Sequence, residues 1–168
     1  MRRAAHLAGL VFAAALLGCE DPDAFTTSPG ECYAGEIVGA DFVREGFPDG
    51  IRAYLTLDAA NLARGLGDAG RVWTGDGRFD GAAVSQMKEL AHDSLSLFQF
   101  PGGRVRNYMA HATAVDGAPA MLVISLMEDE GVELRVLRPP VAGAPELDPL
   151  FGVFRLDIDS RCSPPGGS

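Results

Sequence analysis

The chain of 168 residues has little positive charge, little histidine and little cysteine. Its 14 lysines and arginines stand against 23 acidic residues, and Lys88 is the one lysine. A surface with this excess of acids repels phosphate groups, so nucleic acid and anionic lipid head groups are poor partners. We therefore predict that the protein does not bind nucleic acid.

The scarcity of histidine limits the catalytic chemistry that the chain can perform. Of three histidines, His6 lies in the N-terminal apolar segment, which leaves His92 and His111. His92 precedes Asp93 and Ser94, but neighbours in sequence do not make a triad, because nucleophile, base and orienting group must converge in space. We predict no catalytic residue, no metal and no cofactor, and we expect that the protein is not an enzyme.

A charged and then apolar segment opens the chain. Met1-Arg2-Arg3 is followed by an apolar stretch over residues 7–17, which is too short to span a bilayer stably. The stretch ends in Leu16-Leu17-Gly18-Cys19, just before an acidic break that contains Pro22. This segment resembles the lipobox signal peptide of bacterial lipoproteins. A short buried helix is the alternative, and the acidic break argues against it.

The resemblance implies an address and a covalent attachment. In that family the peptide is cut before the cysteine, so residues 1–18 would be the signal peptide and Cys19 the first mature residue. Its sulfur would carry a diacylglycerol and its amino group an acyl chain, and several chains on one residue anchor a protein stably in a membrane. Glu20, where an aspartate would resemble an inner-membrane retention signal, favours the outer membrane of the cell envelope.

The resemblance also divides the three cysteines. With Cys19 consumed by the lipid, Cys32 and Cys162 remain as an even pair in an oxidising compartment, and we expect them to form a disulfide. Free thiols or a metal-binding pair are the competing interpretation. We expect residues 19–31 to be a disordered tether, residues 32–162 to be one folded domain and residues 163–168 to be a disordered tail.

Within this domain the hydrophobic pattern mostly has a period of two. Val132, Leu134 and Val136 alternate with charged residues, and Phe154, Leu156 and Ile158 do the same. Both segments are typical of half-buried antiparallel strands. Further strands are predicted at 35–43, 51–57, 71–74, 95–100, 104–115 and 120–127. The fold class predicted is mainly β: a single antiparallel β-sandwich or β-barrel of roughly seven or eight strands with one short helix.

The helix is predicted after Asp80, which would be its N-cap. Apolar residues recur there at helical spacing, and the predicted helix ends near His92. We expect its apolar face to pack on the sheet, although an amphipathic stripe of this kind could also face a membrane. A second, weaker helical turn is predicted after Asp58.

Three further motifs are explained by ordinary structure. The glycine spacing over residues 65–70 matches a dinucleotide fingerprint, but the strand predicted after it favours a loop. Asp76 and Asp80 are better explained by turn and cap chemistry than by a calcium loop. Arg104 and Arg106 share a face of a strand and could hold a carboxylate or an acidic partner, but salt bridges to the domain's own acids are favoured.

Two functions of different class stay open at this stage. The lipobox, the tether and the bracketing cysteines resemble small lipoproteins of GC-rich proteobacteria of the myxobacterial type, a resemblance that brings no activity with it. Export, a tether, a disulfide and a compact fold without a convergent set of polar residues favour a non-catalytic binding or structural module that presents its loops to an envelope protein partner. The alternative is a carrier resembling a lipocalin, holding a small hydrophobic ligand in a barrel. Its mouth could be lined by aromatic residues, namely Tyr54, Trp73, Phe98, Phe100 and Tyr108.

Overall fold

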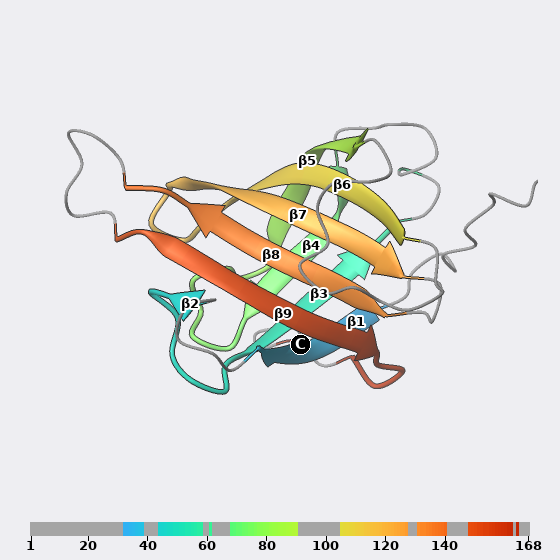
Figure 1. Cartoon of the computed structure of the whole chain (residues 1–168), viewed down its shortest axis with the longest axis horizontal. Helices are drawn as coiled ribbons and strands as arrows, with labels where there is room; N and C mark the ends of the chain where they lie inside the picture. Colours follow the sequence, from blue (N-terminus) through green and yellow to red (C-terminus); the bar gives the residue numbers. More distant parts are fainter. Residues whose placement is uncertain are drawn as a thin grey trace, which may run out of the picture.

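A computed structural model describes residues 32–38, 44–58, 61, 68–90, 105–127, 131–140, 148–162 and 164. These residues form strands joined by short turns and by connections outside the described residues (Figure 1). The strands are β1 (Cys32–Ile37), β2 (Arg44–Glu45), β3 (Arg52–Leu57), β4 (Asp68–Thr74), β5 (Ala82–Leu90), β6 (Val105–Thr113), β7 (Pro119–Met127), β8 (Val132–Arg138) and β9 (Leu150–Ile158).

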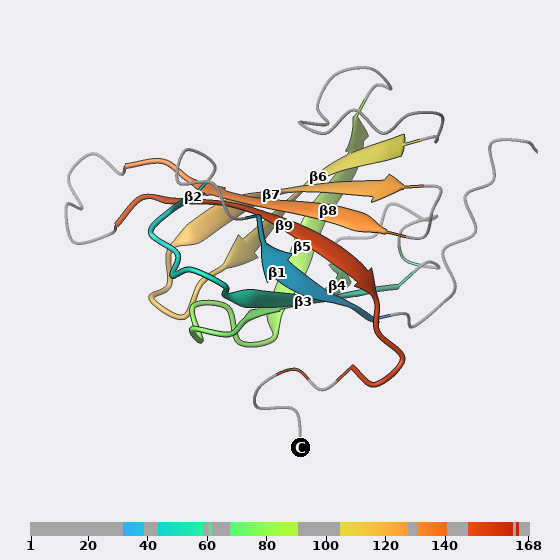
Figure 2. The ribbon, with the colours of Figure 1, turned by 60° about the horizontal axis from the view of Figure 1, so that its bottom comes forward.

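The strands close into an antiparallel barrel. Neighbours follow the order β1-β3-β4-β5-β6-β7-β8-β9, and β1 pairs with β9 to complete the ring of eight strands. The two-residue β2 extends the β9 edge beyond β1, with Arg44 opposite Gly152. In Figure 2, β7, β8 and β9 form an upper wall above β1 and β3. The predicted β class is therefore confirmed, and of the two predicted architectures the barrel is the one formed.

Alternation of small and large apolar residues fills the inside of the barrel. Every second residue of β3, β7 and β8 is buried, as the period of a strand requires. The largest side chains with less than 2% exposure include Phe79, Phe154, Leu55, Leu122, Ile124 and Leu134. These residues belong to one hydrophobic cluster that draws on strands all round the ring. Burial of this continuous apolar surface stabilises the fold.

The outer face carries a row of polar residues that runs round part of the barrel. One residue each from β6, β7, β8, β9, β1 and β3 lies directly opposite the next, in the order Asn107, Ser125, Glu133, Arg155, Glu36 and Arg52. Ser125 donates a 2.7 Å hydrogen bond to Oδ1 of Asn107, and Glu133 forms an ion pair with Arg135. From Glu133 to Arg52 the charges alternate in sign, which favours this strand register.

The helix predicted after Asp80 is wrong over the residues described, because Ala82–Leu90 form strand β5. Its pairing with β6 contains a register shift between Ser85 and Lys88, where Gln86 adopts a φ of 55°. This β-bulge adds one residue, so the core-facing positions are Ala82, Val84 and Met87, spaced by two and then three. A strand with this spacing imitates the apolar period of a helix. Asp80 lies in a bend and caps no helix.

Of the remaining predictions, the structure describes only some of the residues concerned. The residues at 95–100 and His92 lie outside them, as do residues 1–31. Asn61 is helical and its N–H donates a 3.0 Å hydrogen bond to Oδ1 of Asp58, which is the capping geometry expected for a helical turn there. Within the described ranges, no helix has both the length and the apolar character needed to cross a membrane.

The disulfide between Cys32 and Cys162 is present, with 5.7 Å between the two Cα atoms. It links the start of β1 to the turn that follows β9, and the N–H of Asp159 donates a hydrogen bond to the carbonyl oxygen of Cys32 beside it. The sequence separation of 130 residues means that the bridge closes almost the entire domain. The first and last strands of the barrel are thus held together both by pairing and by a covalent bond.

Candidate functional site

A charged cleft of about 340 Å³ lies at one end of the barrel. Its walls come from the β4–β5 turn, the β6–β7 turn, the end of β8 and the start of β9. The residues that line it are Asp76, Gly77, Arg78, Ala114, Val115, Asp116, Arg138 and Leu150. We call this group the charged cleft. Its volume lies at the lower end of the range for sites that hold small ligands.

The β4–β5 turn fixes the first acid–base pair of the cleft. Oδ1 of Asp76 accepts hydrogen bonds from the Thr74 hydroxyl at 2.6 Å and from the Arg78 N–H at 3.1 Å. Oδ2 lies 3.1 Å from Nε of Arg78. Gly77 occupies the turn with a φ of 75°, a conformation that glycine adopts without strain. The Asp76-Gly77-Arg78 sequence therefore forms both the turn and the ion pair within it.

The β6–β7 turn repeats this chemistry. Oδ1 of Asp116 accepts a 2.9 Å hydrogen bond from the Ala118 N–H, and Gly117 follows with a φ of 81°. Oδ2 accepts a 2.7 Å hydrogen bond from Nη1 of Arg138. The two turns are also joined directly, because the N–H of Val115 donates to the carbonyl oxygen of Arg78 at 2.9 Å. The cleft is thus a single hydrogen-bonded unit.

Arg138 occupies the last inward position of β8, after Val132, Leu134 and Val136, and is 4% exposed. Its Nε donates a 3.0 Å hydrogen bond to the carbonyl oxygen of Asp148, in addition to the bond to Asp116. A buried guanidinium needs partners of this kind because burial without them carries a large desolvation cost. Arg138 therefore places a charged guanidinium at the end of the barrel, where its hydrogen bonds to Asp116 and Asp148 fix its position.

Hydrogen bonding and charge lower the pKa of Asp116. The largest cause is the hydrogen bond from the Ala118 N–H, and desolvation opposes it. The hydrogen bond and charge of Arg138, and the charge of Arg78, add to the lowering of the pKa. Asp116 is therefore ionised at neutral pH, and both of its carboxylate oxygens accept hydrogen bonds although the residue is exposed.

Arg78 connects the cleft to a pair of aromatic side chains in the core. The rings of Phe47 and Phe154 meet edge to face, with 5.5 Å between their centroids and an interplanar angle of 85°. The guanidinium carbon of Arg78 lies 5.6 Å from the centroid of the Phe47 ring, within the range of a cation–π contact. Nη1 of Arg78 is buried and has no hydrogen-bond acceptor among the described residues. The guanidinium is thus held over a ring but is incompletely hydrogen-bonded.

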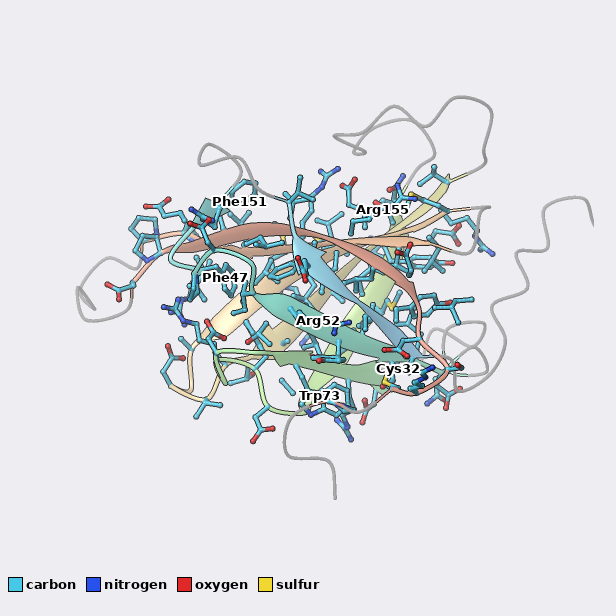
Figure 3. All side chains as sticks on the ribbon, turned by 90° about the horizontal axis from the view of Figure 1, so that it is seen from below. Cys32, Phe47, Arg52, Trp73, Phe151 and Arg155 are labelled. Carbon is cyan, nitrogen blue, oxygen red and sulfur yellow. A yellow bond between two sulfur atoms is a disulfide. The ribbon has the colours of Figure 1, made fainter. Side chains whose placement is uncertain are left out.

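The cleft and the disulfide lie at opposite ends of the barrel. In an up-and-down barrel, the turns after β4, β6 and β8 share one end, while β1 begins and β9 finishes at the other. Figure 3 shows Cys32 at one end of the ribbon and Phe47 and Phe151 at the other. Cys32 and the disulfide are therefore far from the cleft.

Of His92 and His111, the structure describes only His111. Cys19 and His92 lie outside the described residues, and His111 is half-buried on the outer side of β6. Ser85 lies opposite His111, but its hydroxyl donates to the His111 carbonyl oxygen, at 3.2 Å, and not to the imidazole. His111 is therefore a strand residue, as predicted.

Gly70 of the glycine motif and Arg106 of the arginine pair have structural roles. Gly70 lies in β4, and a Cβ there would collide with the carbonyl oxygen of Thr56 on β3, so close strand approach accounts for this glycine. Arg104 is outside the described residues. Arg106 binds both carboxylate oxygens of Glu89 at 2.9 Å, which is the internal salt bridge that the sequence favoured.

The aromatic residues proposed to line a barrel mouth do not do so as a group. Tyr54 and Trp73 are register partners on β3 and β4 and alternate with the buried core, so they lie on the outer face. Tyr108 points inward and is 7% exposed, and burial is the main cause that raises its pKa. Phe98 and Phe100 lie outside the described residues.

The cleft has neither a metal-binding group among the described residues nor a counterpart in a matching family. Among the described residues, no group of three or more His, Cys, Asp or Glu side chains could hold a metal ion. No protein-family model matches the chain, and neither a curated protein nor a solved structure is significantly similar to it. The geometry of the cleft is therefore the basis for a functional proposal.

The cleft is not evident from the sequence because its charged residues are dispersed along the chain. Asp76 and Arg78 are 38 to 62 residues away from Asp116 and Arg138 by sequence number. One signal was present: Asp-Gly occurs both at Asp76-Gly77 and at Asp116-Gly117, and such pairs favour turns. Placing both turns at one end requires the strand order, which the alternating pattern alone does not supply.

Proposed function

We propose that the protein is a lipid-anchored lipoprotein of the bacterial cell envelope, held in the outer membrane through Cys19, and that it acts as a non-catalytic binding module. The observation that carries the proposal is the separation between the charged cleft and the disulfide end. A tether over residues 19–31 would attach at the disulfide end, and the cleft would then face away from the anchor. A ligand or an envelope partner could reach it there.

The dimensions of the domain support this arrangement. Strands β5, β6, β7 and β9 have nine residues each, which corresponds to about 30 Å at roughly 3.3 Å per residue. A fully extended tether of residues 19–31 would add at most about 45 Å. The cleft would therefore lie beyond the lipid head groups, while the attachment point remained close to them.

The carrier resembling a lipocalin is the second candidate, because a closed up-and-down barrel of eight strands is the architecture of such carriers. In the described strands, however, large apolar side chains occupy the inward positions, and the charged cleft lies at the barrel end. This arrangement favours a site at the end of the barrel over a ligand in its interior.

Native mass spectrometry of the full-length protein, purified from bacterial membranes in mild detergent, tests both candidates. The binding module predicts a mass that begins at Cys19 with acyl chains and one disulfide, and no apolar molecule released on denaturation. A released hydrophobic molecule would replace the module with the carrier.

Cysteine variants provide the matched comparison for the anchor. Cys19→Ala should leave the precursor uncut and without lipid. The double variant Cys32→Ser/Cys162→Ser should keep its acyl chains and stay in the membrane fraction. A Cys19→Ala protein that is still processed and membrane-bound would overturn the anchor.

A further inference from the structure

We infer that the charged cleft binds the free carboxylate of a short peptide that ends in a small apolar residue. The inference rests on the proposed function, because it names the ligand of that same cleft. Three features carry it: an excess of hydrogen-bond donors, an apolar wall and a near balance of charge.

The donors exceed the acceptors because both carboxylates are already engaged. Asp76 accepts from the Thr74 hydroxyl and from the backbone and side chain of Arg78, and Asp116 accepts from Ala118 and Arg138. A guanidinium carries five N–H donors. Within the described part of the chain, hydrogen bonds and ion pairs use only Nε of Arg78, together with Nε and Nη1 of Arg138.

An arginine with spare donors is well suited to a carboxylate. The planar fork of a guanidinium matches the two oxygens of a carboxylate, and such charge-assisted bonds are among the stronger hydrogen bonds in proteins. The buried Nη1 of Arg78 lacks an acceptor, so a small rotation of its guanidinium toward an incoming carboxylate would remove a deficit that already exists.

The remaining wall of the cleft is apolar. Ala114, Val115 and Leu150 line it beside the ion pairs, and Val115 is 69% exposed at the tip of its turn. A cleft of about 340 Å³ accepts a terminal residue with a small side chain and part of the residue before it. The apolar wall would contact that side chain while a guanidinium binds the carboxylate.

The charge of the cleft and of the whole chain favours a peptide carboxylate over a phosphate as the ligand. The two arginines of the cleft are balanced by two aspartates, and the whole chain has a net charge of −9. A dianionic phosphate would be repelled by both aspartates and by the surrounding surface. A single carboxylate carries one charge and needs one guanidinium. Its source would be a protein C-terminus or a peptide of the cell wall, whose terminal residues have D configuration.

Isothermal titration calorimetry of the full-length lipoprotein in detergent tests the inference. The probes are N-acetyl-L-alanyl-L-alanine, N-acetyl-D-alanyl-D-alanine and the two corresponding carboxamides. We expect at least one acid to bind roughly tenfold more tightly than its amide, which lacks the charge. Preference for the L acid indicates a protein terminus, and preference for the D acid indicates the cell wall. Absence of binding by both acids, or equal binding of acid and amide, overturns the inference.

Matched variants locate the binding. Arg78→Gln should weaken binding of the acid by roughly tenfold, whereas Arg106→Gln, an ion-paired arginine at the opposite end, should not change it. Val115→Asp should also weaken binding by placing a negative charge beside the cleft, with the exposed Ile158→Asp as its control. Equal effects of a cleft variant and its control would contradict the assignment.

The two proposals can fail separately. A protein that carries acyl chains and the disulfide but binds neither acid overturns the ligand and leaves the anchored module intact. A protein that binds the acid but is never acylated overturns the anchor alone.

Discussion

Glu36 and Arg155 lie directly opposite each other in the β1–β9 pair, at the seam where the first strand of the barrel meets the last. Arg155 also lies directly opposite Glu133 on its other side, in the β8–β9 pair. Arg155 thus has an acidic residue opposite it on each of the two neighbouring strands. Opposite charges in facing positions stabilise a sheet, and like charges in those positions destabilise it.

Substitutions at Arg155 should therefore weaken the seam in a defined order. Arg155→Gln removes the attraction to both acids, and Arg155→Glu places three acids in a row. We expect the free energy of unfolding to fall by roughly 1 kcal/mol for Gln and by about 2 kcal/mol for Glu. Chemical denaturation measures both values. If the Glu variant were as stable as the Gln variant, charge would not be what stabilises this register. Added salt should reduce the difference between them.

Removal of the disulfide should lower stability more than any of the other substitutions. For a closed loop on the order of 100 residues, chain entropy predicts a loss of about 4 to 5 kcal/mol in the Cys32→Ser/Cys162→Ser variant. The thermal midpoint should fall by roughly 10 to 20 °C. Calorimetry with and without a reducing agent measures the change. The reductant should lower the midpoint of the native protein and leave that of the variant unchanged; equal responses would show that the bridge does not form in solution.

The β-bulge at Gln86 predicts a stabilising glycine. A left-handed conformation costs a non-glycine residue about 1 to 2 kcal/mol, whereas glycine in a strand costs about 0.5 to 1 kcal/mol through chain entropy. Gln86→Gly should therefore raise the thermal midpoint by a few degrees. Lys88→Gly, in the same exposed strand but without a positive φ, should lower it. A lower thermal midpoint for both variants would contradict the left-handed conformation of Gln86.

Asp116 predicts a pH-dependent contribution to stability. Its folded-state pKa is lowered, chiefly by the Ala118 N–H, so this stabilisation is complete above the unfolded value of about 3.9 and is lost as the pH falls through the folded pKa. Asp116→Asn keeps an acceptor for Ala118 but removes the charge beside Arg138. The midpoint difference between native protein and variant should be constant at neutral pH and should disappear as the pH falls through the lowered folded-state pKa.

The matched control for that titration is Asp80→Asn. Asp80 is exposed and forms no ion pair within the residues that the structure describes. The thermal midpoint of Asp80→Asn should be close to that of the native protein at neutral pH, because this substitution removes an exposed acid without breaking an ion pair among the described residues. An Asp116→Asn difference that persisted at low pH would mean that the substitution acts through packing.

The strands with an unbroken alternation were predictable from the sequence, and the one with an extra residue was not. In segments such as 132–136 and 154–158 every second residue is apolar, and this alternation directly predicts a strand with one buried face. In β5 the bulge shifts that side by one position after Ser85, and the resulting spacing is that of a helix. The hydrophobic pattern also could not distinguish a sandwich from a barrel, because the strands of both architectures alternate in the same way.

The charged cleft depends on information of a different kind. The Asp76-Gly77 half is local, because Arg78 bonds to Asp76 within one turn, whereas Asp116 bonds to Arg138, which lies 22 residues away on β8. The meeting of the two halves depends on which strands end together, and on Arg138 occupying the last inward position of β8. Those facts follow from closure of the ring, which is a long-range property of the chain.

The bridge between Cys32 and Cys162 also makes the folded part of the polypeptide a covalent ring. A protease that cuts any one of the connections inside that ring leaves a molecule in a single piece, with no strand released. Two cuts are needed before a fragment can diffuse away. The domain would in this way remain assembled after the first break.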